Sequence, residues 1–167
     1  MDRCYYACQL LLNSVDTFVI WYSDGLDGFV VTPEGYLVAA NSSENLVMIA
    51  ANLGLKLEHQ KITVYDFDSL LAWCQAPASE GVHATMFLNA WNFFDDLTGL
   101  QANLESRYVF LSRQASYIYE KLFYGNNLPS ITPIGEHYIP SWSNDELIEM
   151  RLVFMAGLDH LKKKLEL

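Results

Sequence analysis

The chain has 167 residues, of which 51% are hydrophobic and 14% aromatic, and its formal net charge at pH 7 is −10. This apolar content excludes a disordered chain, and the sequence contains no run of eighteen apolar residues that would predict a transmembrane helix. Because a chain of this size typically buries roughly 70% of the surface exposed in its unfolded form, we expect a single domain over residues 1–167.

The first predicted elements are two strands, residues 5–12 and 17–22. Both segments are apolar and rich in aromatic or β-branched residues, which favour strands. Each ends at polar residues that favour turns, at positions 13–14 and 23–25.

A β-hairpin is predicted next. Residues 28–31 and 36–39 flank the sequence Thr32-Pro33-Glu34-Gly35. The proline presets φ for a turn, and the glycine accepts a positive φ.

A short helix follows the hairpin. Ser42 or Ser43 can cap a helix that runs to about Leu53 and stops at Gly54. The apolar stripe of this helix comprises Leu46, Ile49 and Leu53.

Residues 62–65 form a short apolar run that is typical of a strand. Asp66 or Asp68 can cap the helix that comes after it. We expect this helix to reach Cys74 and to stop near Pro77, because a proline disfavours helical geometry in the residue before it.

The hydrophobic period changes to 3.6 residues between positions 83 and 98. Phe87, Trp91 and Phe94 recur at steps of four and three, which predicts the buried face of a helix. The opposite, polar stripe comprises Thr85, Asn89, Asn92 and Asp96.

The C-terminal part is predicted to be helical, with one long loop. Residues 107–124 form a helix candidate that ends at residues 125–127, and three prolines place residues 128–142 in a loop. Ser143 and Glu146 form a capping box before a long final helix. The apolar positions of that helix are Leu147, Phe154, Leu158, Leu161 and Leu165, and Lys162, Lys163 and Lys164 complement the negative end of its dipole.

This order of elements predicts the fold class. Strands come first and helices afterwards, which is typical of an α+β fold. We expect a mainly antiparallel N-terminal sheet covered by C-terminal helices.

The charge is distributed unevenly along the chain. Residues 1–110 hold thirteen carboxylates against four Lys or Arg residues, whereas residues 111–167 hold seven against six. A negative surface repels nucleic acid and anionic lipid and attracts a basic protein. The sequence therefore indicates a basic protein partner, with no nucleic acid and no membrane as partner.

The cysteines and the N-terminus indicate a cytoplasmic protein. The three cysteines, Cys4, Cys8 and Cys74, leave one unpaired under any disulfide scheme, which favours reduced thiols. Asp2 offsets Arg3, and polar residues interrupt the apolar stretch that follows, unlike a signal peptide. No further Cys or His completes a zinc site, so we expect no metal and no other cofactor.

No catalytic motif is convincing, and we expect a protein that is not an enzyme. Asp66 and Asp68 after an apolar run resemble the Asp-x-Asp of haloacid dehalogenase-type phosphatases. That chemistry also needs Mg²⁺ held by further acids, and a lysine that precedes a later acidic pair in the chain. Here Asp95 and Asp96 come before Lys121. Helix capping explains Asp66 and Asp68 more simply. Asp95 and Asp96 are adjacent on a helix and point about 100° apart, so they do not converge on one ion.

Three segments carry a resemblance to a known family. They are Ala90-Trp91-Asn92-Phe93-Phe94-Asp95-Asp96-Leu97, Leu122-Phe123-Tyr124-Gly125 and Pro140-Ser141-Trp142. The sequence resembles immunity proteins of bacterial contact-dependent growth inhibition systems in these segments. The resemblance implies a small cytosolic protein that binds and blocks a toxin domain, often a nuclease, delivered by a neighbouring cell.

A nuclease must be basic to hold its substrate, so exposed carboxylates are the expected contacts. The first candidates lie in turns, because loops on a rigid scaffold commonly carry binding residues. The candidates in turns are Asp24, Asp27 and Glu34, and the second group is Asp66, Asp68, Asp95 and Asp96; Tyr36 or Trp142 is a candidate aromatic anchor. The alternatives are a subunit or interaction protein with another partner, and an Asp-dependent metal phosphatase.

Overall fold

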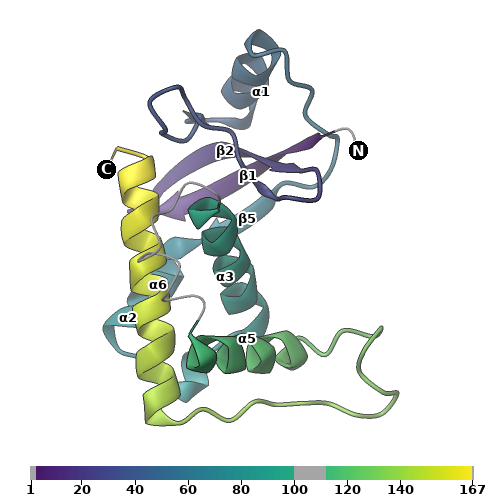
Figure 1. Ribbon diagram of the computed structural model, residues 1–167, viewed down its shortest axis with the longest axis vertical. Helices are drawn as coiled ribbons and strands as arrows, with labels where there is room; N and C mark the ends of the chain where they lie inside the picture. Colours follow the sequence, from purple (N-terminus) through teal and green to yellow (C-terminus); the bar gives the residue numbers. More distant parts are fainter. Residues whose placement is uncertain (1–2, 100–111, 167) are drawn as a thin grey trace. The chain divides into compact units, whose positions relative to one another are not determined.

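The computed structural model describes residues 3–99 and 112–166, and the chain forms two compact units (Figure 1). The sheet unit comprises residues 1–68 and 159–167, and the helical unit comprises residues 69–158. An N-terminal sheet and mainly C-terminal helices confirm the α+β prediction.

The sheet unit is built on a long antiparallel pair, β1 (Cys4–Leu12) and β2 (Val15–Ser23). Asn13 and Ser14 connect the two strands, and both have a positive φ, of 55° and 59°. Two consecutive positive φ values match the right-handed twist of the flanking strands, which makes this the favoured two-residue hairpin turn. The predicted turn at positions 13–14 is confirmed.

Two short strands, β3 (Gly28–Phe29) and β4 (Ala39–Ala40), both pair with β2. The predicted hairpin between them is confirmed in a shorter form, closed by a bridge between Val31 and Leu37. Its turn is held by hydrogen bonds from the Gly35 amide to the Thr32 carbonyl and from the Thr32 amide to the Tyr36 carbonyl. Gly35 has a φ of +90°, as its place in the turn requires.

The last strand, β5 (Thr63–Asp66), pairs with β1 and runs parallel to it. The strand order is β3-β2-β1-β5, so the sheet is mainly antiparallel, as predicted, with one parallel pair. The connection from β1 to β5 contains β2, the hairpin and helix α1.

Helix α1 (Ser43–Asn52) packs on the sheet. Ser42 is its cap, since the Ser42 side chain accepts a hydrogen bond from the Asn45 amide at 3.2 Å. Leu46 and Ala50 are buried against Ile20 and Val38 of the sheet unit. The predicted stripe is wrong at Leu53, which is 52% exposed because the helix ends one residue earlier and the chain turns away there.

The helical unit contains four α-helices and one short 3₁₀ turn within the described residues. They are α2 (Phe67–Gln75), η1 (Ser79–Gly81), α3 (Ala84–Thr98), α5 (Arg113–Gly125) and α6 (Asn144–Lys164). The first residues of α2 and the last residues of α6 belong to the sheet unit. None of the helices in residues 3–99 and 112–166 is long and apolar enough to cross a membrane.

Two further predicted helix starts, those of α5 and α6, can be compared with the structure. Ser112 caps α5 and accepts a hydrogen bond from the Ala115 amide, so the helix begins at Arg113, whereas positions 107–111 of the predicted helix lie outside the described residues. The predicted capping box is confirmed: the Ser143 amide donates to Glu146 at 2.7 Å, and the Glu146 amide donates to the Ser143 hydroxyl at 3.3 Å.

Aromatic side chains fill the core of the helical unit. Phe154 of α6 lies edge-on or tilted against four other rings, those of Trp73, Phe87, Trp91 and Phe94. The predicted burial of Phe87, Trp91 and Phe94 is confirmed. A Cβ atom on Gly157 would overlap the ring of Phe94, so only glycine allows this close approach.

The predicted loop between α5 and α6 is clamped by one side chain. Asn127 donates to the Tyr138 carbonyl at 2.9 Å and accepts from the Tyr138 amide at 2.6 Å. These two bonds close the loop at its base. Its apolar side chains remain exposed, with Ile134 fully accessible and Ile139 78% exposed.

Candidate functional site

The turn after β2 carries the first two predicted contacts, Asp24 and Asp27. Asp24 accepts a hydrogen bond from the Arg3 guanidinium at 2.6 Å, and this bond, with a second from the Leu26 amide, lowers the pKa of Asp24. Asp27 is exposed and accepts a hydrogen bond from the Ser23 hydroxyl at 2.6 Å. Arg3 therefore largely compensates the charge of Asp24, whereas Asp27 has no cationic partner among residues 3–99 and 112–166.

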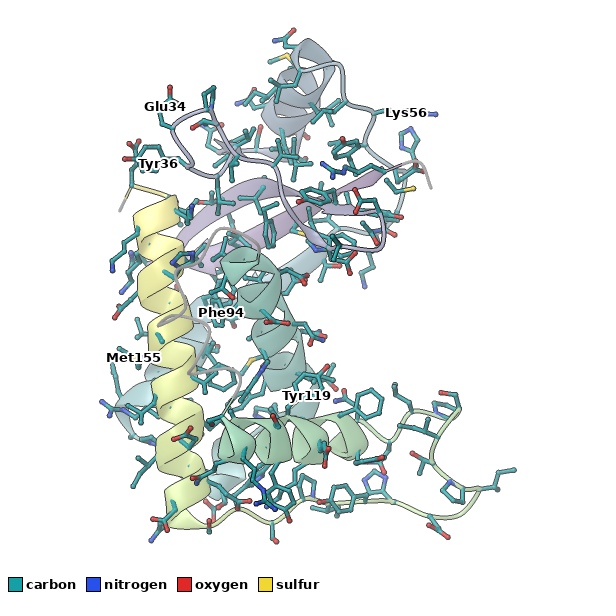
Figure 2. The ribbon with its side chains drawn as sticks, in the orientation of Figure 1. Glu34, Tyr36, Lys56, Phe94, Tyr119 and Met155 are labelled. Carbon is teal, nitrogen blue, oxygen red and sulfur yellow. The ribbon has the colours of Figure 1, made fainter. Side chains whose placement is uncertain are left out.

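Glu34 lies in the hairpin tip, which we define as residues 32–36. The side chains of Glu34 and Tyr36 are both exposed and leave this tip close together in sequence (Figure 2). The tip is fastened to the end of α6, because the Lys164 ammonium donates to the Gly35 carbonyl at 2.8 Å and the Leu37 amide donates to the Lys164 carbonyl at 2.8 Å. An acid and an aromatic ring are thus presented on a turn that is braced from within its own unit.

Asp68 has a structural role that sequence reasoning missed. Its two carboxylate oxygens accept hydrogen bonds from the amides of Asn13 and Ser14, each at 2.7 Å. Both oxygens are therefore engaged by the turn between β1 and β2. A phosphatase would need this carboxylate as a proton donor, so the arrangement favours a structural role over the enzymatic alternative.

Asp66 ends β5 and is half-buried, immediately before the first residue of α2. This position is the one that a capping residue occupies.

Asp95 and Asp96 lie on α3 in the helical unit, where Asp95 is exposed and Asp96 is half-buried. Near them, burial first and then the charge of Asp95 raise the pKa of Tyr119. The Tyr119 hydroxyl donates to the Asn92 side chain at 3.1 Å. Asp95 is therefore the more accessible of the two carboxylates.

The sheet unit does not gather its predicted acids into one patch. Asp24 and Asp27 follow the end of β2, while Asp68 is bound at the turn before its beginning. A nine-residue strand separates these two places by roughly 30 Å. The hairpin tip is a third, separate location. It connects β3 to β4, which both pair with β2.

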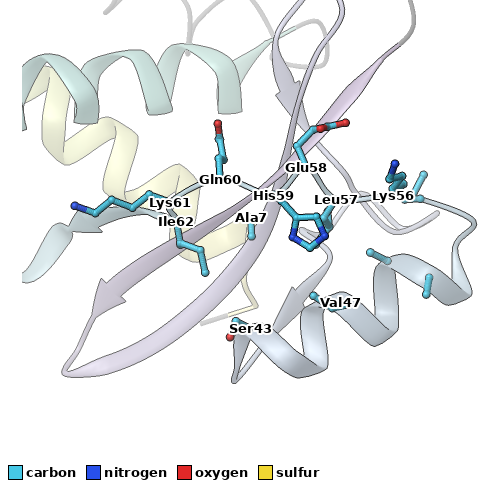
Figure 3. A pocket seen from close by; sticks show the side chains of 13 residues that line it. Ala7, Ser43, Val47, Lys56, Leu57, Glu58, His59, Gln60, Lys61 and Ile62 are labelled. Atoms are coloured by element: carbon cyan, nitrogen blue, oxygen red, sulfur yellow. The ribbon is translucent and has the colours of Figure 1, made fainter.

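A pocket of about 730 Å³ lies in the sheet unit, between α1, β1 and the segment that leads into β5 (Figure 3). Its inner surface includes Ala7 of β1, Ala50 of α1 and the side chains of Leu57 and Ile62. These residues are buried or half-buried. No sequence motif marks this pocket, because its lining comes together only once the strand and the helix are packed.

Metal-binding side chains and reactive cysteines give no further candidate site among the described residues. Within the part of the chain that the structure describes, no three His, Cys, Asp or Glu side chains are placed to hold a metal ion. Cys4, Cys8 and Cys74 form no disulfide within the described residues, and burial raises the pKa of Cys74 to about 11. A thiol in this state is a poor nucleophile.

Comparison with known proteins adds no relative. No family model matches the chain, and neither the curated proteins nor the solved structures include a significantly similar one. The hairpin tip and the other exposed segments therefore have to be interpreted from their own chemistry.

Proposed function

We propose that this chain is a cytoplasmic immunity protein of a contact-dependent growth inhibition system, which binds and neutralises a cognate basic toxin domain, in the first instance a nuclease. The observation that carries the proposal is the braced hairpin tip, which exposes Glu34 and Tyr36 together. The resemblance in the three segments noted above agrees with it.

The tip combines two features of protein-binding surfaces. Tyrosine is enriched among the residues that dominate interface energies, since its ring is large and loses little conformational freedom on binding. A neighbouring carboxylate steers a cationic partner and selects against anionic ones. Because the tip is already held by Lys164, little ordering remains to be done on binding.

The overall charge supports the same partner. The net charge of −10 accelerates encounter with a basic surface and slows encounter with nucleic acid. The surface with which a nuclease holds its substrate is cationic because it contacts phosphates, so an acidic protein can cover it. Asp27 and Asp95 are further exposed carboxylates that add to this field. Asp24 adds less because Arg3 is bonded to it.

A co-expression experiment tests the proposal. The proposal predicts that the adjacent reading frame encodes a large secreted protein with a basic C-terminal domain. That domain, expressed from an inducible promoter together with the full chain, is the probe. We expect the domain alone to stop growth and the wild-type chain to restore it.

The double variant Glu34→Gln with Tyr36→Ala should fail to restore growth at matched expression. The control is Glu80→Gln, which removes an exposed carboxylate of η1 in the helical unit and should restore growth fully. Growth arrest that the wild-type chain leaves unchanged would refute the immunity function. Restoration by the double variant would refute the assignment of the hairpin tip.

A further inference from the structure

A long loop of the helical unit projects as an arm. The chain leaves the end of α5, extends beyond the helices and returns to the start of α6 (Figure 1). We define the apolar arm as residues 128–139. Its sequence contains no Lys or Arg, and Glu136 is its one formally charged residue at pH 7.

Both ends of the apolar arm are fixed to the helices. On the α5 side, the Asn127 side chain makes two hydrogen bonds to the backbone of Tyr138, at 2.9 and 2.6 Å. On the α6 side, the Lys121 ammonium lies 4.6 Å from the centre of the Trp142 ring and donates to Glu146 at 2.7 Å. The base of the arm is therefore closed, and the cation next to it is already paired with a carboxylate.

A turn within the arm fixes the position of its most exposed side chain. The Glu136 amide donates to the Pro133 carbonyl at 3.0 Å, and Gly135 between them has a φ of +87°. Glycine adopts this φ without strain. Ile134 lies in the same turn, and its side chain is fully accessible. The turn therefore presents Ile134 in a defined conformation.

The side chains that the arm exposes are large and apolar. Ile134 and Ile139 are the most accessible, and Leu128, Ile131 and Tyr138 are 40–42% exposed. Apolar groups that are exposed together, rather than singly, mark places of contact with a protein or a membrane. A conformation that is fixed in advance lowers the entropy that is lost on binding. The arm therefore has the properties of a binding element.

The charge around the arm selects among the possible partners. Residues 69–158, the helical unit, contain nine carboxylates against four Lys or Arg, and no Lys or Arg lies between positions 122 and 150. Anionic lipid is disfavoured, because binding to it depends on Lys and Arg near the inserted side chains. A second copy of the chain is also repelled, since it carries the same net charge of −10. A cationic protein is the partner that this charge favours.

We propose that the apolar arm inserts Ile134 and Ile139 into an apolar cleft of the cationic toxin domain. This inference rests on the proposed function, because the partner is the same domain, and it adds a second contact, in the helical unit. The acidic surface and the hairpin tip then govern the rate of encounter. The buried isoleucines govern the rate of dissociation.

Binding kinetics of the full-length chain with the C-terminal domain that we predict in the adjacent reading frame test this contact. Ile134→Ala with Ile139→Ala shortens two exposed side chains, so this variant is expected to fold. We expect it to dissociate between about tenfold and about a thousandfold faster than the wild-type chain, because each truncation removes three buried carbon atoms from the complex. Its association rate should change little, since neither substitution changes a charge.

The matched control is Ile148→Ala with Leu152→Ala. It removes the same number of carbon atoms from two exposed side chains of α6 in the same unit. Its dissociation rate should stay within about twofold of the wild-type rate. Equal acceleration in the two double variants would overturn the assignment of the arm.

Separate results distinguish failure of the arm from failure of the proposed function. A wild-type chain that does not bind the domain would refute both. Wild-type binding with an unchanged dissociation rate in the Ile134→Ala and Ile139→Ala variant would overturn the arm alone. So would flotation of the wild-type chain with phosphatidylglycerol vesicles, or a wild-type dimer in light scattering, if the same variant abolished it. The arm would then contact a membrane or a second copy of the chain.

Discussion

The sheet unit and the helical unit differ in how their cores are filled. In the helical unit, Phe154 is surrounded by four aromatic rings, and even the backbone of Gly157 is in contact with a ring. In the sheet unit, the core around Ile20 and Leu46 is aliphatic and includes small residues, and a pocket remains beside it. Large rings fill the described core of the helical unit, whereas alanines and short turns in the sheet unit leave a pocket and projecting side chains. The hairpin tip is one of these short turns.

The largest expected effect is in the aromatic core. Phe154→Ala should lower the free energy of unfolding by about 3–5 kcal/mol, since it removes a fully buried ring and the contacts of its neighbours. Leu152→Ala is the control, because Leu152 lies on the same helix and is 51% exposed. Urea denaturation followed by tryptophan fluorescence measures both. A loss below about 1 kcal/mol for Phe154→Ala would show that the aromatic core is looser than described.

A smaller effect is expected at the turn between β1 and β2. Asp68→Asn keeps the size of the side chain but leaves only one good acceptor for the amides of Asn13 and Ser14. Because the turn is exposed and water can replace the lost bond, we expect a loss of about 1 kcal/mol in unfolding free energy. Asp159→Asn, an exposed carboxylate in the same unit, should change it by less than about 0.5 kcal/mol. Equal stability of the two variants would contradict the structural role of Asp68.

The smallest stability effect is expected at the hairpin tip. Lys164→Met removes the hydrogen bond to the Gly35 carbonyl but keeps the backbone bond to the Leu37 amide. We expect the tip to open more readily by about 0.5 kcal/mol, the lower end of the net contribution of such a bond. Hydrogen exchange of the Thr32 amide measures this opening, because that amide is bonded within the tip. Lys163→Met should leave the exchange rate of the Thr32 amide unchanged. Equally fast exchange in this control and in Lys164→Met would contradict the role of the Lys164 hydrogen bond in holding the hairpin tip.

Local features of the fold could be predicted from the sequence. The cap at Ser42 and the capping box at Ser143 and Glu146 follow from side chains that interact with backbone groups within four residues. The turn at positions 13–14 follows from two polar residues that favour turns, and both adopt a positive φ. The burial of Phe87, Trp91 and Phe94 followed from helical periodicity. These rules need no knowledge of which distant segments meet.

The candidate sites depend on contacts between residues that are far apart in the sequence, and they were predicted only in part. The Lys164 ammonium meets the Gly35 carbonyl across 129 positions, and Asp68 meets Asn13 across 55. Sequence reasoning assigned Lys164 to the helix dipole and Asp68 to a helix cap or a partner contact, since each role requires only neighbours. The pocket arises from the unequal lengths of two paired segments, which becomes apparent only when their register is known.

The most direct test of the central claim measures the association rate of the chain with the toxin domain that we predict in the adjacent reading frame, at low and at high ionic strength. We predict that the wild-type rate falls steeply with salt, and that Glu34→Gln lowers the rate at low salt more than Glu80→Gln does, because Glu34 lies at the contact. The opposite result is a rate that is independent of salt, or equal losses in the two variants, and it would contradict binding through the hairpin tip.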